Sequence, residues 1–239
     1  MKDTIGCLII HGFAGNLGEI EPLNKYLSSK GFITECPILK GHMGSRQDLA
    51  AAKYTQWIES AEKSLLELNS RCNRVIIIGF SMGGLIAVNL AAKHKTHGIV
   101  TLNTPIYHWD IKRIATNVAN DIKTKDYKHI KYYIGSAASI PFSAMINFKV
   151  LLRKSKPLLK NIRCPIFITQ GLVDDTVHHK SADYIYKNVS SSIKYIKYYE
   201  NSNHLICHSI DNKDVFRDIE SFIANINSER TDKKPKTSG

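Results

Sequence analysis

The stretch from Arg74 to Lys93, RVIIIGFSMGGLIAVNLAAK, decides the fold that the sequence predicts. It opens with a continuous apolar run, Val75 to Ile78, which is typical of a strand buried on both faces of a parallel sheet. Apolar residues then recur at helical spacing: Leu85, Val88, Ala91 and Ala92. Between the two segments lies the pattern G-x-S-x-G, so Ser81 is expected at a sharp turn from a strand into a helix. Taken alone, the pattern also fits an ordinary turn with a capping serine.

Strand-like and helix-like segments alternate along most of the chain. This order predicts an α/β fold, with a mainly parallel sheet of about six strands flanked by helices. Strands are expected at residues 5–10, 32–36, 75–78, 98–102, 165–169 and 193–199. Helices are expected within residues 20–27, 54–68, 85–92, 181–186 and 215–226.

One long segment breaks this alternation. Residues 106–163 separate two predicted strands and are mostly helical in pattern. Loops without secondary structure are rarely this long in a compact domain, so we expect a folded insertion, an inserted helical cap. The core then consists of residues 1–105 and 164–227, and the polar residues 228–239 are expected to form a disordered tail.

The 239 residues carry a formal net charge of +12, which suggests nucleic acid or anionic lipid as a partner. The predicted cap holds twelve lysine or arginine residues against three aspartates, so the rest of the chain carries only +3. No nucleic-acid motif accompanies this charge, and a solvated basic surface is the simpler interpretation. We therefore expect no nucleic-acid partner. A transient contact with a lipid interface stays open, as does the choice between a monomer and a homodimer.

The cysteines and the apolar runs bear on the location of the protein. Five cysteines are widely spaced, without a C-x-x-C pair. This spacing argues against a disulfide framework or a zinc ribbon and predicts reduced, mostly buried thiols. No apolar run approaches the length of a membrane span, and the run near Met1 is too short for a signal peptide. The sequence therefore predicts a cytoplasmic protein.

A serine nucleophile requires a base that takes its proton and an acid that orients this base. The acid candidates, Asp174 and Asp175, directly follow a predicted strand, and spacing alone does not separate them. The candidate base, His204, lies between the last strand and the last helix, and His208 is the alternative one turn later. Open parallel sheets place their ligand sites at the carboxyl ends of the strands. The sequence therefore predicts that Ser81, one of the two aspartates and His204 meet there.

Catalysis at a serine also requires backbone N–H donors for the oxyanion that forms during attack. The first candidate is the N–H of Met82, which follows the nucleophile, and the second is that of Phe13 in the loop HGFAG. Among the loop residues at the same edge, His11, Gly12 and His42 are expected to line the substrate pocket or to brace the loops. Met145, in the predicted cap, is expected to contact the substrate as well.

These residues resemble the α/β-hydrolase superfamily over nearly the whole chain, and within it small bacterial carboxylesterases and monoacylglycerol lipases. The resemblance rests on the segments HGFAGN, PILKGHMGS, GFSMGG, QGLVDDTV and ENSNHLI. The family pattern G-x-x-D-x-x-V carries the acid at its fourth position, which implies Asp174 rather than Asp175. The family pattern H-G-F-x-G likewise implies the oxyanion role for Phe13. As departures, Asn203 replaces the usual glycine before the histidine, and the first strand begins almost at Met1, where family members have one or two earlier strands.

The resemblance implies a serine hydrolase that cleaves carboxylic esters through an acyl-enzyme. The expected substrates are small molecules, either short- to medium-chain acyl esters or monoacylglycerols, and neither a cofactor nor a metal is expected. A thioesterase or lactone hydrolase with the same triad is the nearest alternative. A non-catalytic basic protein that binds lipid or polymer through the cap is the alternative from another class.

Overall fold

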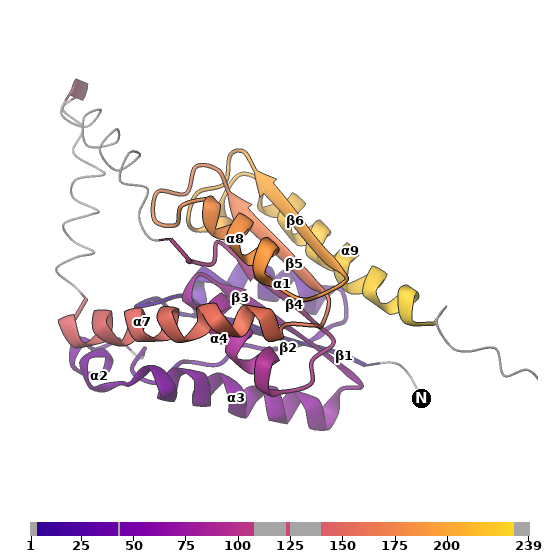
Figure 1. Cartoon of the computed structure of the whole chain (residues 1–239), viewed down its shortest axis with the longest axis horizontal. Coiled ribbons are helices and arrows are strands. Elements are labelled where there is room, and N and C mark those ends of the chain that lie inside the picture. Colours follow the sequence, from indigo (N-terminus) through magenta and orange to yellow (C-terminus); the bar gives the residue numbers. More distant parts are fainter. Residues whose placement is uncertain (1–3, 43, 108–122, 125–139, 232–239) are drawn as a thin grey trace, which may run out of the picture.

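The computed structural model describes residues 4–42, 44–107, 123–124 and 140–231. In these residues, six strands form one parallel sheet in the order β2-β1-β3-β4-β5-β6 (Figure 1). The strands are β1 (Ile5–Ile10), β2 (Ile33–Glu35), β3 (Arg74–Phe80), β4 (Gly98–Leu102), β5 (Ile166–Gly171) and β6 (Lys194–Tyr199). The predicted α/β class and the predicted number of strands are thereby confirmed.

Helices cover both faces of this sheet (Figure 1). The α-helices are α1 (Glu21–Ser29), α2 (Arg46–Ala51), α3 (Tyr54–Arg71), α4 (Met82–Lys93), α7 (Phe142–Ser155), α8 (Lys180–Asn188) and α9 (Asn212–Thr231). Short 3-10 turns are η1 (Leu17–Glu19), η2 (Lys156–Asn161) and η3 (Ile206–His208). Helices α1 and α9 pack on one face, and α3, α4, α7 and α8 pack on the other.

The apolar run of β3 supplies both halves of the core. Side chains of a strand alternate between the faces of a sheet, so a strand covered on both sides needs apolar residues at every position. Val75 and Ile77 accordingly pack in the cluster beneath α3 and α4, whereas Ile76 and Ile78 pack in the cluster beneath α1 and α9. The continuous apolar run, which predicted a strand covered on both faces, thus contributes side chains to both core clusters.

The strand order creates a crevice at one place along the carboxyl edge. The chain passes from β1 outward to β2 and then returns to β3 on the other side of β1. Loops that leave β1 and β3 therefore run in opposite directions, and parallel sheets bind ligands at such a switch point. The loop after β1 carries His11 to Gly15, and the turn after β3 carries Ser81. The topology thus brings the two predicted parts of the site side by side.

Two elements differ from the sequence-based expectation. Helix α2 follows the segment PILKGHMGS, where the sequence indicated only a loop. Ser45 caps this helix by accepting a hydrogen bond from the Asp48 N–H, but six residues are too few to show a helical apolar period. Helix α9 continues to Thr231 and so includes the start of the predicted tail. Residues 232–239 of that tail lie outside the described residues.

The predicted cap is described only at its edges, because residues 108–122 and 125–139 lie outside the described residues. Helix α7 and turn η2 belong to its second half. Helix α7 buries Ala144, Phe148 and Leu151 in the core cluster that also contains α3 and α4. The boundary between core and cap therefore stays a prediction. None of the described helices is both long enough and apolar enough to cross a bilayer.

Candidate active site

Ser81 sits in a strained turn between β3 and α4. Its φ of 51° and ψ of −119° lie in a region that residues with a side chain rarely adopt. Its N–H donates to the carbonyl of Leu102 on the neighbouring strand, and its carbonyl accepts from the Gly84 N–H. These two bonds hold the backbone in the sharp turn. The predicted turn from strand to helix is therefore present at this serine, in the form typical of a nucleophile elbow.

The glycines on either side of Ser81 are required by close backbone contacts. A Cβ atom at Gly79 would lie 2.3 Å from the backbone of Gly83, across the turn. A Cβ atom at Gly83 would lie 2.2 Å from the carbonyl oxygen of Ile10, on the first strand. Helix α4 can start this close to β1 only because both positions lack side chains. The glycines thus fix the distance between the turn and the loop after β1.

The structure brings Ser81, His204 and Asp174 together from three different strand ends. Ser81 Oγ lies 3.2 Å from Nε2 of His204, and Nδ1 of His204 lies 2.9 Å from Oδ2 of Asp174. All three side chains are largely shielded from solvent: Ser81 is 8% exposed and the Asp174 side chain is 0% exposed. This chain of contacts has the geometry of a nucleophile, a base and an orienting acid.

The two candidate aspartates differ sharply in their contacts. Asp174 also accepts hydrogen bonds from the N–H groups of Thr176 and Val177, at 2.8 Å and 2.9 Å. These bonds point Oδ1 into the turn and leave Oδ2 for His204. Asp175 instead accepts a hydrogen bond from the Thr176 hydroxyl. Of the two aspartates that the spacing left open, Asp174, the one that the resemblance implied, is therefore the one in contact with His204, and its role as the acid stays a prediction.

His204 has a pKa above the ordinary histidine value. Burial by itself would lower this pKa, but the charge of Asp174 and its hydrogen bond to Nδ1 outweigh the effect of burial. The carboxylates of Glu19 and Asp175 raise the pKa further. The alternative base, His208, is exposed and its Nε2 lies 2.8 Å from the carbonyl oxygen of Gly18. Only His204 of these two histidines thus contacts both the serine and the acid.

Asn103 joins the loop of His204 to the strand that precedes Asp174, and no sequence pattern marked it. The residue follows β4, is completely buried and has a φ of 46°, which asparagine tolerates better than most residues. Its Nδ2 donates to the carbonyl oxygens of Asn203 and His204, and its Oδ1 accepts from the Gly171 N–H at 2.7 Å. Asn103 therefore fixes the backbone of His204 relative to β5.

The loop His11–Gly15 curves over the carboxyl end of β1 beside the serine. Ala14 adopts a φ of 54°, which gives the loop its tight bend. The Phe13 ring stacks on Phe148 of α7 with centroids 4.9 Å apart and also contacts Trp57. Neither the N–H of Phe13 nor that of Met82 has a hydrogen-bond acceptor among the described residues. Both predicted oxyanion donors are thus available, and the oxyanion role itself stays a prediction.

His11 and His42 are buried beside this loop. Nδ1 of His11 lies 2.9 Å from the Gly12 carbonyl oxygen, and its Nε2 accepts a hydrogen bond from the Leu39 N–H at 3.3 Å. The two rings meet edge-on, with centroids 5.1 Å apart. Burial lowers the pKa of His11 to about 4 and lowers the pKa of His42 as well. Both histidines are therefore neutral braces between loops.

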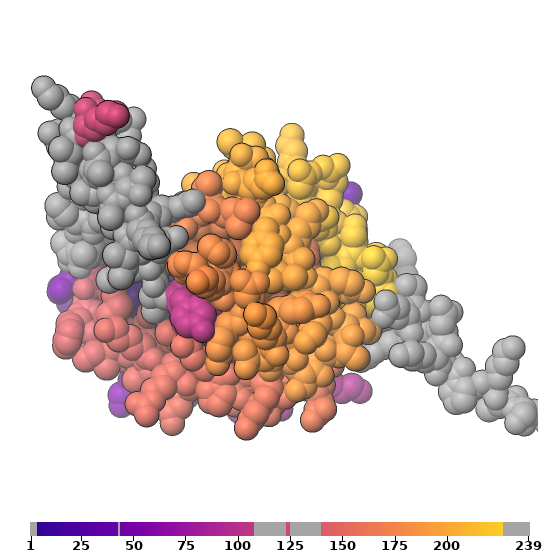
Figure 2. Space-filling model, turned by 45° about the horizontal axis from the view of Figure 1, so that its top comes forward, coloured from indigo at the N-terminus to yellow at the C-terminus, as the bar shows by residue number. Residues whose placement is uncertain are grey.

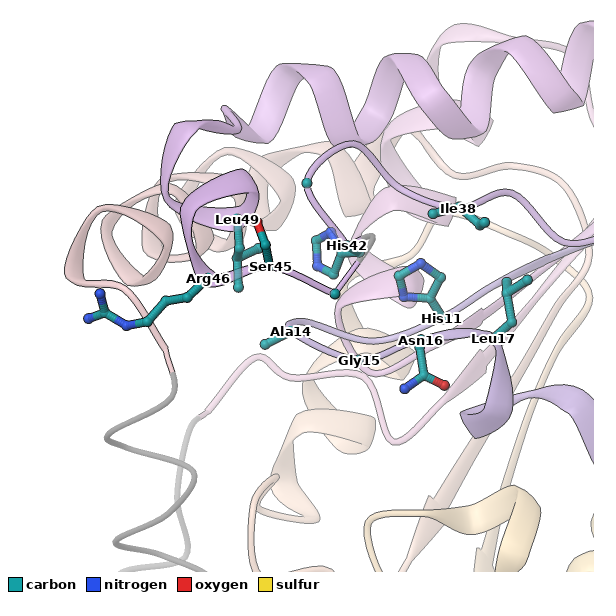
Figure 3. A pocket seen from close by; sticks show the side chains of 12 residues that line it. His11, Ala14, Gly15, Asn16, Leu17, Ile38, His42, Ser45, Arg46 and Leu49 are labelled. Carbon is teal, nitrogen blue, oxygen red and sulfur yellow. The ribbon is translucent and has the colours of Figure 1, made fainter.

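A cavity of about 680 Å³ opens on the outer side of the same loop (Figure 3). Its lining includes His11 and His42, which were expected to line a pocket, whereas Ser81 is not among the residues that line it. Gly12 contacts Glu19 and Phe80. Met145 is half-buried and packs against the larger core cluster. Direct contact of Gly12, His42 or Met145 with a substrate stays a prediction.

No group of three or more histidine, cysteine, aspartate or glutamate side chains in the described ranges could hold a metal ion. The five cysteines are free thiols, and burial raises the pKa of Cys7 and Cys207 to about 12. Protonated thiols of this kind are poor ligands and poor nucleophiles.

Comparison with known proteins supports the fold class. Residues 8–120 match the family model described as alpha/beta hydrolase fold. The chain has the α/β-hydrolase fold. It is 28% identical over 233 residues to the thermostable monoacylglycerol lipase of a Bacillus species, covering 91% of this chain and 90% of the relative. It is 23% identical over 224 residues to a carboxylesterase of Bacillus subtilis, covering 90% and 91%.

Two solved structures illustrate the same fold. One comes from a study of two metagenome-derived lipolytic enzymes and superposes on this chain with a TM-score of 0.78 at 21% identity, covering 93% of this chain and 94% of the other. The other is a soluble variant of monoglyceride lipase from Saccharomyces cerevisiae, with a TM-score of 0.73 at 20% identity, covering 94% and 87%. Both superpositions support the α/β-hydrolase fold of this chain.

Proposed function

We propose that the protein is a serine hydrolase of carboxylic esters, with Ser81 as nucleophile, His204 as base and Asp174 as orienting acid. The observation that carries this proposal is the continuous contact from Ser81 Oγ through His204 to Asp174, at 3.2 Å and 2.9 Å. These distances lie at or near hydrogen-bonding range, and contacts of this kind tighten when substrate binds. The kinship with a monoacylglycerol lipase and a carboxylesterase supports esters as the substrate class.

In the proposed reaction, His204 Nε2 takes the proton of the Ser81 hydroxyl as the oxygen attacks the ester carbonyl carbon. The carbonyl electrons move to the oxygen, and the N–H groups of Phe13 and Met82 stabilise the resulting oxyanion. The intermediate collapses to an acyl-enzyme, and His204 passes its proton to the departing alcohol. Water, deprotonated by the same histidine, then attacks the acyl-enzyme and releases the acid together with free Ser81.

The finer substrate assignment is a short- to medium-chain acyl ester or a monoacylglycerol. Support comes from the loop His11–Gly15, where the half-buried Phe13 offers an apolar surface that is backed by the buried rings of Trp57 and Phe148. Each buried methylene contributes about 0.8 kcal/mol, so such a surface can distinguish acyl chains of different length. Transient contact with a lipid interface and a cytoplasmic location stay predictions from the sequence.

The test of the proposal is the purified Ser81→Ala variant beside the wild type. Both are assayed with a fluorophosphonate probe and with p-nitrophenyl esters of about two to about twelve acyl carbons, so that the contribution of each added methylene to binding can be seen. We expect the wild type to hydrolyse the esters and to be labelled at Ser81, and the variant to do neither. Ser70→Ala is the matched control, because the Ser70 hydroxyl is exposed and donates only to the carbonyl of Glu67.

Two outcomes would contradict this proposal in different ways. An unchanged rate in Ser81→Ala would remove the serine from the reaction. A wild type that reacts with neither esters nor fluorophosphonate would favour the non-catalytic alternative, a basic protein that binds lipid or polymer. A thioesterase or lactone hydrolase with the same triad would instead label normally and give its highest kcat/KM with thioesters or lactones in the same assay.

A further inference from the structure

Glu19, at the end of η1, places a shielded carboxylate inside the loop His11–Gly15. Its Oε2 accepts a hydrogen bond from the Gly12 N–H at 2.9 Å. A Cβ atom at Gly15 would lie 2.2 Å from either carboxylate oxygen, so the loop closes directly over this side chain. An acid at this point of a glycine-rich loop carries no pattern that marks a role in the sequence. Its position instead makes Glu19 the internal support of the loop that carries Phe13.

The same carboxylate lies on the rear side of the proposed triad. The Gly12 position that contacts Glu19 also contacts the Phe80 ring, and this ring lies 5.2 Å from the His204 ring. The turns on the two sides are tied together where Nε2 of His208 meets the Gly18 carbonyl oxygen at 2.8 Å. Glu19 therefore contacts the loop His11–Gly15 on the side that faces the His204 turn.

Electrostatic coupling is consistent with this placement. Burial raises the pKa of Glu19, while the Gly12 N–H and the nearby His204 and His208 lower it. In return, Glu19 contributes to raising the pKa of His204, together with Asp174 and Asp175. The remaining neighbour with a titratable group is Cys207, whose thiol stays protonated because burial and Glu19 raise its pKa to about 12.

We propose that Glu19 is a positioning residue for the reaction at Ser81. Its carboxylate anchors the Gly12 peptide, which precedes Phe13, and supplies a second negative charge next to His204. Anchoring matters because an oxyanion donor acts only when it is already oriented toward the position that the oxyanion will occupy. The charge matters because it favours the protonated imidazole that forms during attack. This role rests on the proposed function of Ser81, His204 and Phe13.

Two substitutions separate the anchoring role from the charge. Glu19→Gln keeps an oxygen that can accept the Gly12 N–H but removes the charge, whereas Glu19→Ala removes both. Glu21→Gln is the matched control, because Glu21 is exposed and pairs with Lys25 on the surface. For each protein, kcat and KM are measured with p-nitrophenyl butyrate from about pH 5 to about pH 9, a range that spans the titration of histidine. The rate of fluorophosphonate labelling and the inhibition by an alkyl boronic acid are measured on the same samples.

We expect Glu19→Ala to lower kcat about tenfold or more with little change in KM, since loss of a whole oxyanion donor costs about 10²- to 10³-fold. The boronic acid, which mimics the tetrahedral intermediate, should bind more weakly by a similar factor. Glu19→Gln should keep most of kcat and shift the acid limb of kcat/KM to lower pH. Glu21→Gln should match the wild type throughout.

The labelling arm distinguishes failure of this role from failure of the proposed function. A wild type that is labelled, with Glu19→Ala labelled at the same rate and with unchanged kcat, would overturn the role of Glu19 alone. A folded Glu19→Ala protein that loses stability but retains kcat and boronic acid affinity would show a purely structural residue and would also overturn it. A wild type that reacts with neither ester nor probe would overturn the proposed function and the role of Glu19 together.

Discussion

Two histidines at the carboxyl edge of the sheet, His11 after β1 and His204 after β6, are both buried but have different partners. His11 lies between the carbonyl of Gly12 and the N–H of Leu39, so both ring nitrogens meet uncharged backbone groups. His204 lies between the carboxylate of Asp174 and the hydroxyl of Ser81. The pKa of His11 falls to about 4, whereas that of His204 rises above the ordinary histidine value.

Partners, rather than burial, therefore decide what each histidine can do. Burial penalises the charged imidazole at both positions, and only a neighbouring carboxylate reverses this penalty. The loop of His11 is arranged to keep a neutral ring in place as a brace. The carboxylates near His204 instead favour its protonated form, as the proposed general base requires when it takes a proton.

The His204→Ala variant should lose nearly all ester hydrolysis, because no other described residue contacts both Ser81 Oγ and Asp174. Removal of a triad member lowers kcat by about 10⁴- to 10⁶-fold in serine hydrolases. His208→Ala is the comparison, and it should retain most of the activity because the His208 ring meets the Gly18 carbonyl oxygen rather than Ser81 or Asp174. Steady-state kinetics with p-nitrophenyl butyrate measures both variants. Equal losses in the two variants would mean that the base was chosen wrongly.

The acid should show the next largest effect. Asp174→Asn should lower kcat by about 10²- to 10⁴-fold, because an amide cannot stabilise the imidazolium and favours the wrong tautomer of His204. Asp175→Asn should cost far less, since Asp175 accepts a hydrogen bond from the Thr176 hydroxyl, whereas Asp174 contacts the base. Measuring kcat for both variants with one ester settles the pair. A larger loss in Asp175→Asn would contradict the assignment of the acid.

The parts of the site that could be predicted from the sequence are those with a local pattern. The apolar run of β3, the glycines around Ser81 and the placement of His204 between strand and helix each follow from a few adjacent residues. The choice of Asp174 needed the family pattern as well, because two aspartates share the same local context. The fold followed in the same way, since each buried strand and each longer helix carries its own periodicity.

The missed residues act through contacts that are distant in the sequence. Asn103 bonds to Gly171 and His204, which lie 68 and 101 positions away. Glu19 supports Gly12 by folding back across a turn, and an acid in a glycine-rich loop has no pattern that marks this role. Helix α2 was missed for a different reason, because its six residues are shorter than two helical turns. Predicting the contacts of Asn103 and Glu19 requires knowledge of how several strands are placed relative to one another.

Replacing His11 by glutamine should change the pH dependence of stability. A neutral buried histidine destabilises the fold at acid pH, because the unfolded chain binds the proton at about pH 6.5 and the folded chain only near pH 4. Stability from this group is therefore fully present above pH ~6.5 and is lost as the pH falls towards ~4. Glutamine can donate and accept in the same place without titrating.

The expected difference follows from the two pKa values. When the pH is lowered from about 7.5 to about 5, the free energy of unfolding of the wild type should fall by about 2 kcal/mol more than that of His11→Gln. Urea unfolding at the two pH values measures this difference, and comparing each protein with itself cancels the packing cost of the substitution. Identical losses in both proteins would mean that His11 is protonated in the fold, and the contrast with His204 would disappear.

Asp175 is the third carboxylate that raises the pKa of His204, and its removal should change the pH profile only slightly. The base must be unprotonated, so kcat/KM should rise as the pH increases through the pKa of His204, and this rise should centre above pH ~6.5. Asp175 raises that pKa less than Asp174 and Glu19 do. Asp175→Asn should therefore move the rise slightly to lower pH while leaving its plateau nearly unchanged.

The measurement is kcat/KM at closely spaced pH values for the wild type and the variant. Asp183→Asn is the control, because Asp183 on α8 accepts a hydrogen bond from the hydroxyl of Tyr198 on β6. In the wild type, a rise centred below the ordinary histidine pKa would mean that burial also dominates the pKa of His204. The pKa values of His11 and His204 would then both be lowered, and the contrast between the two histidines would be lost.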